Sequence, residues 1–85
     1  MNEKIQIKLE TMKVWAKLSE TAEQMIAGQN EEIGWAQESI DKEMEKPEEE
    51  RQKWLIESRQ TEITEHQRKI KAIEQVQAQI LKIMG

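Results

Sequence analysis

The stretch KEMEKPEEE, residues 42–50, decides the fold, because it contains the only proline of the 85-residue chain. Proline disfavours a helical conformation at Lys46 before it, but it suits the first turn of a new helix. The three glutamates that follow favour the positive end of that helix, while Lys42 and Lys46 suit the C-terminus of a preceding one. The sequence therefore predicts two helices that meet at residues 46–47.

On both sides of this stretch, the residue types are those of long helices. Glu, Lys, Gln, Ala, Ile and Met recur throughout, while the chain has three glycines and neither tyrosine nor phenylalanine. We predict a single all-α domain, a long antiparallel helical hairpin similar to a coiled coil, with helices over residues 3–45 and 47–84. Gly28 followed by Asn30 leaves a kink at residues 28–30 open, although the apolar pattern keeps its phase there.

Apolar residues recur at helical spacing, in steps of three, four or seven, along both segments. Neighbours such as Val14 and Trp15, or Met25 and Ile26, point about 100° apart on a helix, so one partner helix cannot cover both. A helix with two neighbours satisfies this pattern, and we expect the hairpin to self-associate into a helical bundle. The predicted oligomer interface consists of Leu9, Met12, Trp15, Leu18, Ala22, Ile26, Ile33, Ile40, Ile56, Ile63, Ile70, Ile73, Ile80 and Met84.

Charge is distributed unevenly along the chain. Residues 1–18 and 66–85 together carry a formal charge of +5, whereas residues 19–65 carry −9, which gives the net charge of −4. In a hairpin both termini lie at one end, so the rod has a basic open end and an acidic hinge end. An antiparallel dimer brings unlike ends together, while a parallel dimer stacks like on like. We therefore predict an antiparallel homodimer.

Composition excludes several classes of protein. The chain has no cysteine, which rules out disulfide scaffolds, thiolate metal sites and cysteine nucleophiles. No apolar run approaches the roughly 18 residues that span a bilayer, and the N-terminus lacks the apolar region of a signal peptide. We expect a soluble cytoplasmic protein that does not act at a membrane.

The only histidine, His66, is the one candidate for metal binding or proton transfer. Metal sites in helical bundles use Glu-x-x-His pairs, but the residue three before His66 is Ile63. A polar layer that sets the register of the two helices, formed by His66 with Gln29 or Asn30, explains its position better. We therefore expect neither a metal nor any other cofactor.

Catalysis and nucleic-acid binding have little support in the sequence. No serine or threonine sits on the glycine-bearing turn between strand and helix that presents a catalytic nucleophile. Gly28 and Gly34 are not followed by the Lys-Ser/Thr pair of a phosphate-binding loop. Lysines and Arg68 gather near the termini, but the negative residues 19–65 repel a polyanion. We expect a protein that is not an enzyme and does not bind nucleic acid.

Two tryptophans lie away from the main apolar face, in the acidic part of the chain. Interfaces are enriched in tryptophan, so Trp35 and Trp54 are candidates for contact with another protein. The acidic run Glu48, Glu49 and Glu50 is a second candidate, because it would lie at the tip of the hairpin.

Residues Trp54-Leu55, Arg59 and Ile70-Lys71-Ala72-Ile73 resemble the long helix of phage-encoded all-helical sponges that trap cyclic nucleotides from anti-phage signalling. The resemblance covers about 20 residues, and the rest of the chain does not share it. It implies a small-molecule binder as one alternative function.

We expect a non-enzymatic protein–protein interaction module that oligomerises through its apolar helix faces and binds a partner protein as an adaptor or scaffold. The alternative is a small inhibitor or sponge of the phage type, which captures a host protein or an anionic, nucleotide-like ligand. Its binding site would be the oligomer interface or the acidic tip. A thermal-shift screen distinguishes the two, because only the sponge is stabilised by a nucleotide.

Overall fold

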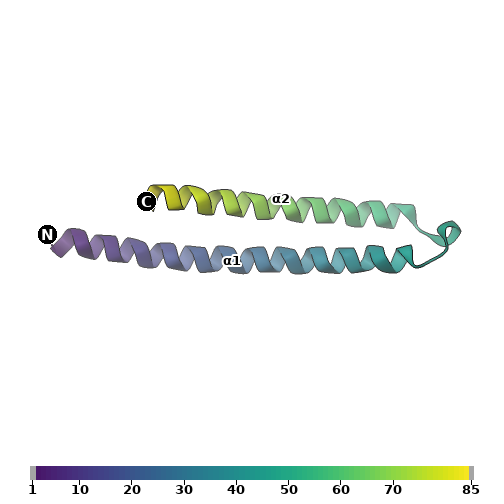
Figure 1. Cartoon of the computed structure of the whole chain (residues 1–85), viewed down its shortest axis with the longest axis horizontal. Helices are drawn as coiled ribbons and strands as arrows, with labels where there is room; N and C mark the ends of the chain where they lie inside the picture. Colours follow the sequence, from purple (N-terminus) through teal and green to yellow (C-terminus); the bar gives the residue numbers. More distant parts are fainter. Residues whose placement is uncertain (1, 85) are drawn as a thin grey trace.

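The computed structural model describes residues 2–84 and, within them, the side chains of residues 3–83. Helix α1 runs from Asn2 to Met44, the short 3-10 helix η1 from Glu48 to Glu50, and helix α2 from Lys53 to Met84. The two long helices lie side by side and antiparallel, and the connection closes one end of the rod (Figure 1). The principal-axis extents are 73 × 15 × 12 Å. The prediction of an all-α helical hairpin is confirmed.

The helices meet along a seam whose residues recur in alternating steps of three and four. This spacing averages 3.5 residues, the repeat at which two helices keep one face together over many turns. The seam therefore consists of one line of buried and half-buried side chains on each helix. The α1 line is Trp15, Ser19, Ala22, Ile26, Gln29, Ile33, Ala36, Ile40 and Glu43, and the α2 line is Ile56, Arg59, Ile63, His66, Ile70, Ile73, Gln77 and Ile80.

Helix α1 is continuous through residues 28–30, where the sequence left a kink open. No glycine among the described residues has a positive φ, so Gly28 takes an ordinary helical conformation. A Cβ atom built on Gly28 would meet no heavy atom within 4 Å. The hairpin itself therefore gives no steric reason for a glycine at this position.

The connection differs from the expectation that helix 2 begins at about residue 47. Pro47 has φ −54° and ψ 144°, η1 follows it, and Arg51 is again extended with φ −72° and ψ 132°. Helix α2 therefore begins only at Lys53, and its 32 residues face the 43 residues of α1. As a result, the N-terminal part of α1 extends beyond the end of α2 (Figure 1).

Side chains in and beside the connection explain why it takes this form. Arg51 donates from Nε to the carbonyl of Lys46 at 2.8 Å and from Nη2 to the carbonyl of Met44 at 2.9 Å. These bonds satisfy the carbonyl of Met44 at the C-terminus of α1, which has no partner within the helix, and that of Lys46 two residues beyond it. The N–H of Gln52 donates to Oε1 of Glu43 at 2.8 Å, so a side chain of α1 caps the start of α2.

Candidate interaction surface

Burial within the hairpin is concentrated towards the connection. We call residues 29–66 the hinge half, and residues 2–28 with 67–84 the open half. Among the described side chains, only Ala36, Ile40 and Glu43 are buried, with 5 %, 7 % and 5 % of their surface exposed. All three lie in the hinge half, whereas the seam side chains of the open half are only half-buried.

The large hydrophobic side chains that remain exposed show the opposite distribution. Ten lie in the open half, and three, Trp35, Met44 and Trp54, lie in the hinge half. The open-half residues are Ile5, Ile7, Leu9, Met12, Val14, Leu18, Met25, Val76, Leu81 and Ile83. Exposed hydrophobic side chains that gather in one region often mark interaction sites in folded proteins.

The total exposed surface supports the same conclusion. The hairpin exposes 7170 Å², whereas a compact monomer of 10.1 kDa exposes about 5,300 Å². The difference of about 1,900 Å² exceeds the area that each partner buries in a standard protein–protein interface, about 800 Å². A single hairpin therefore exposes enough surface to form a stable contact with another chain.

An apolar groove lies between the two helices in the open half, and it encloses about 330 Å³. Its walls come from residues on the seam and from residues one position outside it, so the groove opens on one face of the rod. It is lined by Trp15, Leu18, Thr21, Ala22 and Met25 of α1 and by Ala72, Ile73, Val76, Gln77 and Ile80 of α2. With no charged side chain in its lining, the groove suits an apolar helix face.

A second line of residues runs along α1 beside the groove. We call it the outer stripe: Lys4, Ile7, Thr11, Val14, Leu18, Thr21, Met25, Gly28, Glu32 and Trp35, all exposed and spaced by three or four residues. The hydroxyl of Thr11 donates to the carbonyl of Ile7 at 2.8 Å, and that of Thr21 to the carbonyl of Lys17 at 3.0 Å. Because their own helix satisfies these hydroxyls, the threonine methyl groups remain for apolar contact.

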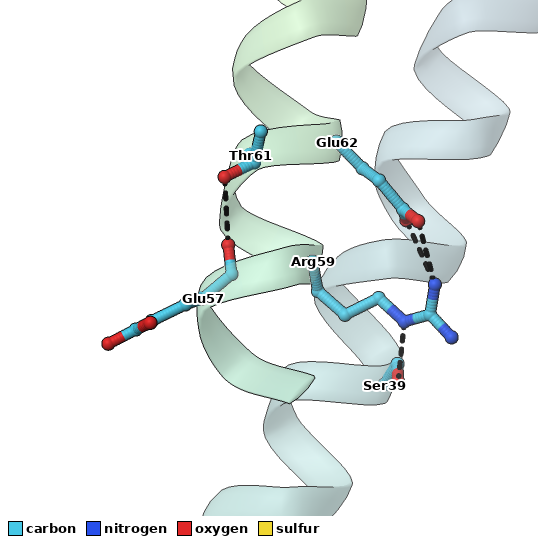
Figure 2. A network of polar contacts seen from close by, with 5 residues as sticks. All are labelled: Ser39, Glu57, Arg59, Thr61 and Glu62. Carbon is cyan, nitrogen blue, oxygen red and sulfur yellow. Dashed lines mark hydrogen bonds and ion pairs between the residues drawn. The ribbon is translucent and has the colours of Figure 1, made fainter. Parts of the chain in front are cut away.

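In the hinge half, the corresponding face of the rod is polar. Arg59 donates from Nη1 to both carboxylate oxygens of Glu62, at 2.8 and 3.1 Å, and from Nε to Oγ of Ser39 on α1 at 3.3 Å (Figure 2). These side chains, with Glu32 and Trp35, line a shallow pocket of about 250 Å³. The outer stripe therefore passes from an apolar groove to a charged cluster as it approaches the connection.

Most residues of the predicted oligomer interface lie in the seam within one hairpin. Ile40 is buried, and the half-buried ones are Trp15, Ala22, Ile26, Ile33, Ile56, Ile63, Ile70, Ile73 and Ile80. Leu9, Met12 and Leu18 lie outside the seam and expose 53 %, 51 % and 49 % of their surface. Met84 ends α2, and its side chain lies outside the described residues.

The predicted polar layer is only partly brought together. Nδ1 of half-buried His66 donates a hydrogen bond to Oε1 of Gln29 across the seam, while Asn30 is exposed. No group of three or more His, Cys, Asp or Glu side chains that could hold a metal ion occurs in the described part of the chain. His66 thus pairs with an amide.

The candidate partner-binding residues are exposed but do not form one cluster. Trp35 exposes 57 % of its surface beside the Arg59–Glu62 pair, and Trp54 exposes 66 % in the first turn of α2. The acidic residues Glu48, Glu49 and Glu50 form η1 and are also exposed. Trp54 and the acidic run are therefore near one another at the hinge end, and Trp35 lies on the outer stripe.

Sequence reasoning named Val14 and Met25 as apolar neighbours of seam residues but did not join them with Ile7 into the outer stripe, which the seven-residue step from Ile7 to Val14 could have indicated.

Sequence reasoning missed the roles of Glu43 and Arg51 at the connection. The hydrogen bond from the N–H of Gln52, together with the nearby ammonium of Lys46 at 3.0 Å, lowers the pKa of Glu43 below its ordinary value of 4.5. No local pattern in the sequence indicates that Arg51 and Glu43 form hydrogen bonds across the connection.

No protein-family model matches this chain, and neither a curated protein nor a solved structure is significantly similar to it. Within residues 2–84, neither helix contains a stretch long and apolar enough to cross a membrane. The surface described above is therefore the main guide to function.

Proposed function

We propose that this chain is a non-enzymatic protein–protein interaction module that self-associates through its apolar helix faces and serves another protein as an adaptor or scaffold. The observation that carries the proposal is the apolar groove of the open half, with Leu18, Met25 and Val76 at its rim. Covering such a groove with a second helix pair completes a four-helix bundle, in which every helix has two neighbours. The self-associated form is an antiparallel homodimer.

Charge supports the antiparallel orientation. The open end of the rod carries the basic segments 1–18 and 66–85, and the hinge end carries most of the acidic residues 19–65. Antiparallel association places each basic end beside an acidic end, which is attractive at distances within the Debye length of about 8–10 Å. The parallel arrangement opposes like charges at both ends.

The hinge end suits contact with the second protein. In an antiparallel dimer the two connections lie at opposite ends of the bundle, so η1 and Trp54 of each chain remain accessible. An exposed tryptophan beside three glutamates provides an apolar anchor with a negative rim, which fits a basic protein surface. Such a dimer would hold two partner molecules apart, as a scaffold does.

Sedimentation equilibrium tests the self-association. We expect twice the chain mass for the wild type and a monomer for Leu18→Glu, because the new carboxylate would be desolvated inside the covered groove. Gln24→Glu is the matched control, because Gln24 is exposed and the substitution adds the same charge outside the groove. A wild-type monomer at every concentration, or a dimer that Leu18→Glu leaves intact, would overturn the proposal.

Nucleotide capture, the alternative from the sequence, has weaker support. The groove has no basic side chain in its lining, and a phosphate needs such groups or backbone N–H donors. A thermal-shift screen with cyclic nucleotides is therefore expected to leave the melting temperature unchanged. A reproducible rise with one of them would favour the sponge over the adaptor.

A further inference from the structure

The outer stripe has an order of residues that matches itself when it is reversed. Read from Lys4 towards Trp35, it begins with a cation, continues through small and apolar residues, and ends with an anion and an aromatic ring. The steps of three and four are also the same in both directions. Two such stripes in antiparallel orientation therefore place small and apolar residues beside one another at the centre and Lys4 beside Trp35 at each end, while Ile7 lies beside the second stripe's Glu32.

We propose that a second copy of the chain docks on α1 along this stripe, with the two-fold axis passing between Leu18 and Thr21. The inference rests on the proposed self-association and specifies its register. The axis lies at the level of the groove, whose α1 wall runs from Trp15 to Met25, so the two grooves cover each other. The contact is isologous and closes after two copies.

In this register, the central contacts are apolar. Leu18 lies beside the partner's Thr21, and Val14 lies beside the partner's Met25. The four side chains are exposed in the single hairpin, and Leu18, Val14 and Met25 expose 49 %, 59 % and 53 % of their surface. Removing the apolar parts of these side chains from water supplies the main driving force for docking.

Gly28 has a role in this arrangement that it lacks within the hairpin. A helix-interior glycine is less favourable than alanine, and no heavy atom lies within 4 Å of a Cβ built at Gly28. In the proposed register, Gly28 lies opposite the partner's Thr11. The missing side chain allows the two α1 helices to approach closely at that level, one on each side of the axis.

The ends of the stripe select the antiparallel orientation. Lys4 lies beside the partner's Trp35 and within one helical turn of the partner's Glu32. The ammonium group thus gains an opposite charge and the face of an aromatic ring. A parallel pair of stripes would instead place Lys4 on Lys4 and Glu32 on Glu32.

Cysteine cross-linking tests the register without interference, because the natural chain has no cysteine. Val14→Cys and Met25→Cys proteins, carrying tags of different mass, are mixed, allowed to exchange and treated with a short bis-maleimide. We expect the heterodimer to exceed either homodimer by about tenfold, because Val14 lies beside the partner's Met25 while identical positions lie about 16 Å apart along the helix axis in this register. Helix content measured by circular dichroism verifies that both variants fold.

Each variant treated alone is the matched control. A predominant Val14→Cys homodimer cross-link would overturn the proposed register. Absence of the heterodimer in a sample that sedimentation shows to be dimeric would overturn this register while leaving the proposed self-association standing. A sample that sediments as a monomer would overturn both.

Discussion

The hinge half and the open half of the hairpin share one heptad spacing but differ in how deeply the side chains at that spacing are buried. In the hinge half, Ala36 and Ile40 are buried and the adjoining face is polar, with Arg59 and Glu62 in an ion pair. In the open half, no described side chain is buried, and ten large hydrophobic residues remain exposed. The same spacing can therefore bury side chains in one part of a molecule and leave them half-buried in another.

The physical reason lies beside the seam. Two helices contact each other along a narrow seam. A side chain one position outside this seam stays exposed unless nearby side chains or a third helix pack against it. In the hinge half those positions hold Glu32, Ser39 and Glu62, which are stable in water. In the open half they hold Leu18, Met25 and Val76, for which exposure is costly.

The largest expected effect comes from truncating the same kind of side chain in each half. Ile40→Ala should lower the free energy of unfolding by about 2 kcal/mol, because Ile40 is 7 % exposed in the seam. Leu18→Ala should cost less in the isolated hairpin, and most of its cost should depend on protein concentration. Urea unfolding at several concentrations measures both. Equal, concentration-independent losses would erase the distinction between the two halves.

A smaller effect is expected from filling the two internal glycines. A Cβ built on Gly28 or on Gly34 meets no heavy atom within 4 Å, so each change to alanine should stabilise the hairpin by about 0.5–1 kcal/mol through helix propensity. Thermal unfolding at low concentration should show similar gains for both. Gly28 lies on the outer stripe, whereas Gly34 lies off it. If the gain from Gly28→Ala disappears at high protein concentration while the gain from Gly34→Ala remains, the result supports the proposed contact at Gly28.

The smallest expected effect concerns pH at the connection. The folded state lowers the pKa of Glu43, so its contribution to stability is present above the ordinary value of 4.5 and is lost as pH falls through the lowered value. Melting temperatures recorded from neutral pH to about 3 should therefore fall less for Glu43→Gln than for the wild type. Glu45→Gln, which removes an exposed carboxylate nearby, should retain the wild-type fall. If both variants behave alike, Glu43 is not the source of the acid sensitivity.

Much of the fold could be predicted from local patterns. Residues of high helix propensity surround a single proline, and their apolar faces recur at a repeat of 3.5, so two packed helices follow from Pro47 and from the spacing of Ile56, Ile63 and Ile70. The sequence predicted a polar layer of His66 with Gln29 or Asn30, and the structure pairs His66 with Gln29. The late start of α2 could not be predicted, because it depends on Arg51 and Glu43 reaching across the connection.

The sequence by itself determined that the chain forms two long helices, that they fold back on each other, and that they carry more apolar surface than one seam can cover. Helix propensity, one proline and periodicity are local properties, and they suffice for these conclusions. Only the tertiary structure decided where that surplus lies. Whether Leu18 or Ile40 is covered depends on the register of the helices and on their side-chain neighbours, and these long-range contacts leave the apolar groove in the open half.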